Sequence, residues 1–241
     1  MNTIRIQKKQ TQLIAHRGLS GLEAENTLCA FVAAGNRSYF GIETDVHRTS
    51  DGQFIIVHDN DTARVAGNAQ VYEVEHTDYA TLRSLPLLDR NGKAGRVDLH
   101  LPSLDEYIEC CRNYGKICVL ELKNRMEKAD VGKIAEHFRA AEYLDRVIFI
   151  SFCLENLIDL REICPDQPVQ YLVRELQEDV FEVANANRMD IDTDWKSVTK
   201  EWVDRLHRAG LKLNAYTIND PEVAERFADW GVDYLTTNIL E

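Results

Sequence analysis

The stretch Leu13–Gly18 reads LIAHRG, in which three apolar residues lead directly into a histidine, an arginine and a glycine. An apolar run of this kind is typical of a buried strand, and the glycine allows a sharp turn where the strand ends. Such a strand delivers a titratable side chain, His16, and a fixed positive charge, Arg17, to the rim of a sheet. The alternative is a strand end capped by solvated polar residues, and the remaining sequence has to distinguish the two.

The segment GIETDVHRTSDGQFIIVHD adds two carboxylates and a second histidine. Asp51-Gly52 is a signal for a two-residue hairpin turn, and that turn predicts Asp45 directly opposite His58. Residues opposed in this way lie about 4.5–5.5 Å apart at Cβ. Because side chains alternate along a strand, Glu43 shares the face of Asp45. We therefore expect Glu43, Asp45 and His58 to converge near the end of the second strand, facing the end of LIAHRG if the two strands are neighbours.

The run ICVLELKN ends in the same manner, with Glu121 and, two residues later on the same face, Lys123. Glu43, Asp45 and Glu121 would then meet at the rim of adjacent strands. Carboxylates packed so closely repel one another, which either raises a pKa or requires a cation. A site made only of oxygen ligands suits a hard divalent metal ion, Mg²⁺ or Ca²⁺. The alternative is an ion-pair network in which Glu43 or Glu121 simply pairs with Arg17 or Lys123.

Strand-like runs alternate with helical patterns along the chain, which indicates parallel βαβ units. The predicted strands are Gln12–Ala15, Gly41–Asp45, Ile117–Lys123, Val147–Phe152, Val169–Arg174, Met189–Asp194, Leu211–Thr217 and Tyr234–Asn238. The predicted helices are Asn26–Asn36, Ser103–Tyr114, Ala129–Ala141, Leu154–Ile163, Leu176–Asn187, Thr199–Ala209 and Pro221–Trp230. Eight such units predict an α/β fold, a (β/α)₈ TIM barrel, with a doubly wound sheet as the alternative.

Three of these helices have recognisable starts. Asn26 is a candidate N-cap, Ser103 with Glu106 forms a capping box, and Asp220-Pro221 supplies a cap and a first-turn proline.

Between the second and third predicted strands, residues 60–102 interrupt the alternation of strands and helices and are rich in glycine and proline. We expect one domain over residues 1–241, with this inserted segment, residues 60–102, following the hairpin and lying over one face of the barrel.

The composition excludes several classes of partner. A net charge of −12 over 241 residues repels nucleic acid and anionic membranes, so an anionic substrate needs a locally positive site. No apolar run reaches 18 residues and the N-terminus has no apolar signal region, so we expect a cytoplasmic protein without stable membrane association. The six cysteines form no CxxC pair and are expected to be free thiols.

Several motifs occur in order along nearly the whole chain. They are HRG at 16–18, ENT at 25–27, E-x-D at 43–45, SDG at 50–52, VHD at 57–59, ELK at 121–123, AYTIND at 215–220 and GVDYLTTN at 231–238. Together these motifs resemble the glycerophosphodiester phosphodiesterase family. The resemblance implies a (β/α)₈ barrel and metal-dependent hydrolysis of a small-molecule glycerophosphodiester to sn-glycerol 3-phosphate and an alcohol.

By matching motifs, the resemblance assigns His16 and His58 as the acid/base pair and Arg17 as a phosphate ligand. It assigns Glu43, Asp45 and Glu121 as ligands of the divalent metal. Lys123 could assist Arg17 in binding the phosphate, while Phe152 and Tyr216, at strand ends, could line the substrate pocket. His47 matches no ligand and is expected to be solvated, and Glu25 could orient Arg17.

Three positions depart from the family pattern: Ala24 replaces a proline, Tyr216 a common tryptophan and Asn238 an aspartate. The last two lie at the expected substrate rim, so they affect the choice of alcohol more than the chemistry. Related activities, lysophospholipase D or phospholipase C, use the same chemistry on larger lipids but usually need an apolar membrane-facing surface. A catalytically inactive binding barrel is the alternative from a different class. The alcohol, the metal, a cyclic phosphate intermediate and the oligomeric state stay open.

Overall fold

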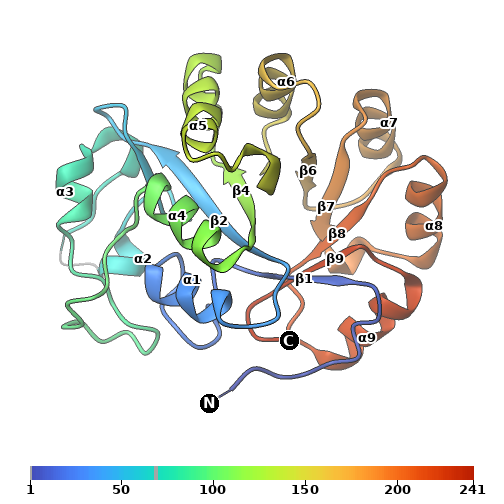
Figure 1. Ribbon diagram of the computed structural model, residues 1–241, viewed down its shortest axis with the longest axis horizontal. Helices are drawn as coiled ribbons and strands as arrows, with labels where there is room; N and C mark the ends of the chain where they lie inside the picture. The colour runs from blue at the N-terminus through green and yellow to red at the C-terminus, as the bar shows by residue number, and fades with distance from the viewer. Residues whose placement is uncertain (1, 68–69) are drawn as a thin grey trace.

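Eight parallel strands close into a barrel in this computed structural model, which describes residues 2–67 and 70–241 (Figure 1). The hydrogen-bonded order is β1-β9-β8-β7-β6-β5-β4-β2, and pairing of β1 with β2 closes the ring. The barrel strands are β1 Gln12–Ala15, β2 Gly41–Arg48, β4 Ile117–Leu122, β5 Val147–Ser151, β6 Val169–Val173, β7 Asp190–Asp194, β8 Leu213–Tyr216 and β9 Tyr234–Thr237. The predicted (β/α)₈ TIM barrel is therefore confirmed, and closure of the ring excludes the doubly wound sheet.

Helices surround the barrel and bury their apolar faces against it. Those between barrel strands are α1 Leu28–Gly35, α4 Leu104–Tyr114, α5 Lys128–Ala140, α6 Leu154–Ile163, α7 Glu178–Asn187, α8 Lys200–Arg208 and α9 Pro221–Trp230. Shorter pieces are α2 Ala63–Ala66 and α3 Tyr79–Arg83, with 3₁₀ turns η1 Val74–His76, η2 Leu144–Arg146 and η3 Trp195–Ser197. The predicted capping box and the Asp220-Pro221 start are confirmed. The predicted cap at Asn26 is wrong, because Thr27 caps α1.

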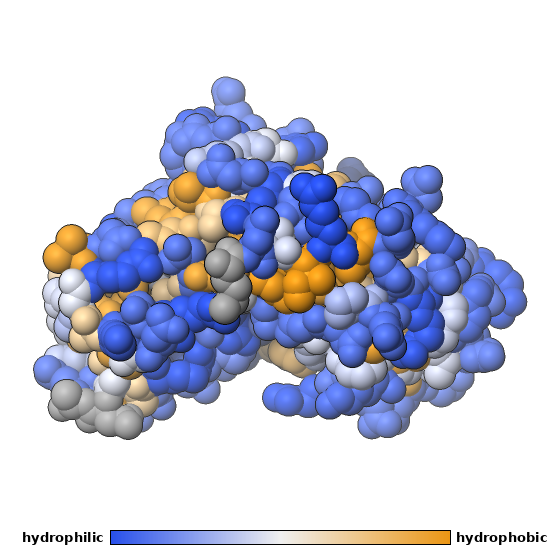
Figure 2. All heavy atoms as spheres, turned by 90° about the horizontal axis from the view of Figure 1, so that it is seen from below, coloured by the Kyte–Doolittle hydropathy of each residue, from blue (hydrophilic) through white to orange (hydrophobic). Residues whose placement is uncertain are grey.

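The main core lies between the barrel wall and the helices. Its largest fully buried side chains include Phe31, Tyr107, Phe138, Phe149 and Phe227. Figure 2 shows a mostly hydrophilic face of the molecule, with apolar side chains gathered near its middle. Among residues 2–67 and 70–241, none of the helices combines the length and the apolar character needed to cross a lipid bilayer.

The hairpin that extends β2 has a different register from the predicted one. Its second strand, β3 Phe54–Ile56, pairs antiparallel with β2, and Arg48 lies opposite Phe54. The loop between Thr49 and Gln53 has three residues, because the Thr49 N–H donates to the Gln53 carbonyl and Gly52 adopts a φ of 80°. A three-residue loop that ends in left-handed glycine replaces the two-residue turn. The partner across from Asp45 is consequently Val57, whose N–H donates to the Asp45 carbonyl at 3.1 Å.

The inserted segment continues from this hairpin and contains α2, η1 and α3 at one side of the barrel (Figure 1). Its apolar side chains form a small separate core with the hairpin, in which Ile55 and Val57 pack against Val74, Leu82 and other leucines. The segment is thus attached to the strand pair that carries part of the polar rim.

Tyr107 on α4 ties two barrel strands together. Its buried hydroxyl donates to the Ile42 carbonyl of β2 at 2.7 Å and accepts from the Val119 N–H of β4 at 3.0 Å. Removing the hydroxyl leaves two backbone groups without this partner, which costs about 1–3 kcal/mol. We therefore predict that Tyr107→Phe lowers the free energy of unfolding by that amount in denaturant titrations. Tyr114→Phe, at an exposed position of the same helix, is the control, and equal stability of the two variants would contradict the prediction.

Candidate active site

Three neighbouring strands bring the predicted polar residues to one rim of the barrel. His16 and Arg17 directly follow β1, and the adjacent β2 carries Glu43 and Asp45. On the other side of β2, parallel pairing with β4 sets Asp45 in register with Glu121. The carboxyl ends of these strands therefore place all five side chains around one point, as expected for the catalytic face of this barrel.

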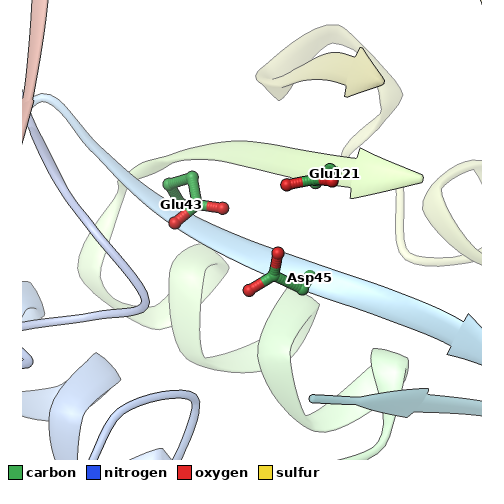
Figure 3. A group of neighbouring side chains, drawn as sticks. All are labelled: Glu43, Asp45 and Glu121. Carbon is green, nitrogen blue, oxygen red and sulfur yellow. The ribbon is translucent and has the colours of Figure 1, made fainter. Parts of the chain in front are cut away.

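The carboxylates of Glu43, Asp45 and Glu121 point toward one another (Figure 3). All three residues are buried, and one oxygen from each lies within 4.8 Å of the others. Burial and the charge of Asp45 raise the pKa of Glu43 well above its usual range, and the same causes raise that of Glu121 to about 8. In the metal-free protein, each of these two groups therefore resists ionisation beside Asp45.

Two cations partly neutralise the cluster. Lys123 Nζ lies 2.8 Å from Glu121 Oε1 and 3.5 Å from Asp45 Oδ1, and Arg17 Nε lies 3.7 Å from Asp45 Oδ2. Although burial opposes ionisation, Lys123 and Arg17 hold the pKa of Asp45 below its usual range. The ion-pair network and the carboxylate cluster thus occur together. Asp45 Oδ1 and Arg17 Nε are buried and form no hydrogen bond with any described residue, so an oxygen is left for a further cation.

Asn26 positions the central carboxylate. It is buried, its Nδ2 donates to Asp45 Oδ2 at 2.8 Å, and its Oδ1 accepts from Thr44 Oγ1 at 2.7 Å. The neighbouring Glu25 accepts from Arg17 Nη1 at 2.9 Å, as the sequence suggested. The ENT motif therefore contributes Asn26 as an orienting residue of the site, in addition to the start of α1. This role of Asn26 was not predicted from the sequence.

His16 is fixed in one tautomer. Its Nδ1 lies 2.7 Å from Asn238 Oδ1, and because an amide oxygen only accepts, Nδ1 carries the hydrogen. The other ring nitrogen, Nε2, faces Glu43 at 3.9 Å with its lone pair available. Burial and the charge of Arg17 lower the pKa of His16 to about 4. Asn238, predicted to affect the substrate rim, thus acts on the histidine.

His58 reaches the site by a different route from the predicted one. It lies beyond β3, after the strand pairing ends at Val57, and is not the partner of Asp45. Its Nδ1 lies 2.6 Å from Asp59 Oδ1, and burial lowers its pKa. His58 nevertheless lines the same pocket as His16. Because the chain bends after Val57, His58 reaches the pocket although the hairpin register differs from the predicted one.

His47 is fully buried, so the prediction of a solvated residue is wrong. The inserted segment covers it: Nδ1 lies 2.9 Å from Glu75 Oε1, and Nε2 lies 3.4 Å from the His58 carbonyl oxygen. Glu75 also accepts from Asn124 Nδ2 at 2.8 Å, at the end of β4. Through Glu75, the inserted segment therefore connects His47, and the His58 carbonyl that His47 contacts, to the end of β4.

One cavity of about 240 Å³ brings most of the predicted site residues together. Its lining includes seven of them, His16, Arg17, Glu43, His58, Glu121, Phe152 and Tyr216. Asp45 and Lys123 do not line it, and their side chains are only 1% and 12% exposed. Six further residues line the cavity and were not predicted from the sequence: Ile150, Leu172, Arg174, Asp192, Thr217 and Thr236.

Two of the missed residues carried a detectable signal, since Arg174 is a charged residue directly after β6 and Asp192 is a charged residue within β7. Arg174 lies with its Cζ 5.6 Å from the centre of the Phe152 ring. Phe152, which is 42% exposed, in turn meets Tyr216 edge to face at 6.5 Å. The cavity thus has a charged end at β1, β2 and β4 and an aromatic end at β5, β6 and β8.

Comparison with known proteins gives a consistent result. A model of the glycerophosphoryl diester phosphodiesterase family matches residues 16–241. A glycerophosphodiester phosphodiesterase of Bacillus subtilis is 26% identical over 251 residues, which cover 93% of this chain and 82% of the relative. The structure of an Oleispira antarctica phosphodiesterase in complex with the product sn-glycerol-3-phosphate has a TM-score of 0.85 at 26% identity, covering 95% of this chain and 93% of that one. A glycerophosphodiester phosphodiesterase from Parabacteroides distasonis has a TM-score of 0.77 at 26% identity, with the same coverage.

The raised pKa of Glu121 predicts a pH-dependent stability. Between about 4.5, its ordinary value, and about 8, the folded state retains a proton that the unfolded state has released, so stability falls as pH rises through this window. Glu121→Gln cannot ionise, and in EDTA its Tm should exceed that of the wild type by a few degrees near pH 8. The gain should be smaller near pH 5, at the lower end of this window. A change of 1 kcal/mol in the free energy of unfolding corresponds to about 2–4 °C in Tm at this size.

Thermal unfolding at both pH values measures this difference. The matched control is the replacement of exposed Glu182 by glutamine. A Tm difference for Glu121→Gln that is the same at both pH values would show that the carboxyl ionises normally.

Proposed function

Because the chain belongs to the glycerophosphoryl diester phosphodiesterase family, we propose that it hydrolyses glycerophosphodiesters to sn-glycerol 3-phosphate and an alcohol. Membership confirms the resemblance predicted from the sequence and, with it, the class of enzyme, a glycerophosphodiester phosphodiesterase. The observation that supports this proposed reaction is a single cavity lined by both histidines and by two of the three clustered carboxylates.

Glu43, Asp45 and Glu121 are the proposed ligands of a divalent metal, Mg²⁺ or Ca²⁺. Their donor set is entirely oxygen, and Asp45 Oδ1, which is buried and accepts no hydrogen bond from a described residue, fits a hard cation. When bound, such an ion supplies positive charge that stabilises the charge developing on the phosphoryl oxygens. Arg17 lines the cavity beside the cluster and adds the charge that attracts a phosphate, while Lys123 adds a second positive charge through its ion pair with Glu121.

The two histidines are proposed to move the two protons that phosphodiester cleavage requires. His16 is suited to act as the base, because Asn238 fixes its Nδ1–H and Nε2 keeps a lone pair beside Glu43, which also lines the cavity. His58 is suited to protonate the leaving alcohol, because the Asp59 carboxylate holds its Nδ1–H and partly offsets the burial that lowers its pKa. The attacking oxygen belongs to water or to the neighbouring hydroxyl of glycerol, and the latter forms a cyclic phosphate first.

Phe152 and Tyr216 are proposed to contact the substrate at the aromatic end of the cavity. We also retain the expectation of one domain over residues 1–241 that acts on a small molecule and not on nucleic acid or a membrane. All six cysteines are free thiols, which supports the proposal of a reducing, cytoplasmic location.

Release of sn-glycerol 3-phosphate from glycerophosphocholine and glycerophosphoethanolamine tests the proposed function. We predict release that EDTA abolishes and that added Mg²⁺ or Ca²⁺ restores, because the carboxylates need a cation. Release that persists in EDTA would contradict the metal site, and no release from either substrate, with metal present, would contradict this substrate class.

Removal of either histidine should abolish most of this activity without unfolding the protein. We predict that His16→Ala and His58→Ala each lower kcat by about 10²- to 10⁴-fold, the range for losing a general acid or base. His76→Ala is the matched control, because that histidine is 81% exposed and pairs only with Glu73 among the described residues. Steady-state kinetics check the prediction, and activity within tenfold of the wild type would remove that histidine from the mechanism.

A further inference from the structure

Arg64 on α2 joins two carboxylates beside the active site. Its Nη1 and Nη2 donate to the two oxygens of Glu25 at 2.7 and 2.9 Å, and its Nε donates to Asp59 Oδ2 at 2.6 Å. A guanidinium presents these donors in a rigid planar fork, so the two carboxylates are held at a fixed separation. Arg64 lies outside the sequence motifs of the family.

Each of these carboxylates holds one proposed site residue through its remaining contact. Glu25 Oε1 accepts from Arg17 Nη1 at 2.9 Å, and Asp59 Oδ1 lies 2.6 Å from His58 Nδ1. The hydrogen bonds therefore form a continuous path, Arg17–Glu25–Arg64–Asp59–His58. The path connects the loop after β1 to the chain after β3 through the inserted segment.

The members of this path are charged in the ways the contacts require. Although burial opposes ionisation, hydrogen bonds from Arg64 lower the pKa of Asp59 to about 2 and that of Glu25 below its usual range. Arg64 itself is 46% exposed at its side chain, so its ion pairs contribute little to the free energy of unfolding. Their main consequence is the orientation of the groups at the two ends.

We propose that Arg64 is a positioning residue, which fixes the phosphate-binding Arg17 and the proton-transferring His58 relative to each other. This inference rests on the proposed function of those two side chains. It also gives the inserted segment a role in catalysis, since a side chain of α2 donates hydrogen bonds to both Glu25 and Asp59. Lysine has a single nitrogen and cannot reproduce the fork, so the position requires arginine.

Kinetics of Arg64→Met and Arg64→Lys test the proposal. Because methionine holds neither the Glu25 nor the Asp59 carboxylate, Arg64→Met should raise KM by loosening Arg17 and lower kcat by loosening His58. The total loss in kcat/KM should be about 10- to 100-fold. Arg64→Lys should recover only part of this loss. Glu25→Gln should mainly raise KM, and Asp59→Asn should mainly lower kcat, which separates the two ends of the path.

Arg96→Met is the matched control. Arg96 also lies in the inserted segment, is 37% exposed and bridges two carboxylates, Glu23 at 2.8 Å and Asp98 at 2.6 Å, but it contacts no proposed site residue. Its kinetic constants should equal those of the wild type. If Arg64→Met loses no more activity than Arg96→Met, or changes only KM or only kcat, Arg64 does not couple the two ends.

A spectroscopic measurement tests the path independently of the substrate. We expect the imidazole ¹⁵N resonances of His58 to shift in Arg64→Met and not in Arg96→Met, because Asp59 loses its second partner. Unshifted resonances in Arg64→Met would overturn the positioning role even if the wild type released no sn-glycerol 3-phosphate. Failure to cleave any glycerophosphodiester, with the shift present, would instead contradict the proposed function alone.

Discussion

The site depends on the burial of three carboxylates at one place. Parallel pairing of β2 with β4 sets Asp45 in register with Glu121, and strand alternation brings Glu43 to the same face. Charges this close and this buried must be neutralised by protons or by cations. Arg17 and Lys123 supply part of the positive charge, but burial and the charge of Asp45 keep the pKa values of Glu43 and Glu121 raised beside them. A divalent cation and an anionic phosphate together would complete the balance.

The polar residues around the cluster act mainly by fixing orientation. Asn26 holds Asp45 and Asn238 holds His16, while Glu25 holds Arg17 and Asp59 holds His58. Most of these partners lie in loops at the carboxyl ends of strands, where a barrel carries its variable residues. The inserted segment extends this arrangement by contributing Arg64 and Glu75, so the hairpin and the barrel rim behave as one support.

Much of the barrel could be predicted from the sequence because its signals are local. Strand β1 has the predicted bounds, and β9 differs from its prediction by a single residue, because apolar runs and breakers mark the ends of buried parallel strands. The hairpin register was wrong because Asp51-Gly52 fits both a two-residue turn and the end of a three-residue loop. The side chain of Thr49 favours the longer loop by accepting from the Gln53 N–H at 3.0 Å. His47 was misplaced because its burial depends on residues far along the chain.

We propose that Glu43, Asp45 and Glu121 together bind a divalent cation. Anomalous scattering from crystals equilibrated with Ca²⁺ tests this binding, since it locates the ion independently of any activity. We predict a peak about 2.3–2.6 Å from an oxygen of each of the three carboxylates. A peak elsewhere in the molecule, or none at this cluster in crystals of a protein that cleaves its substrate with Ca²⁺, would contradict the account.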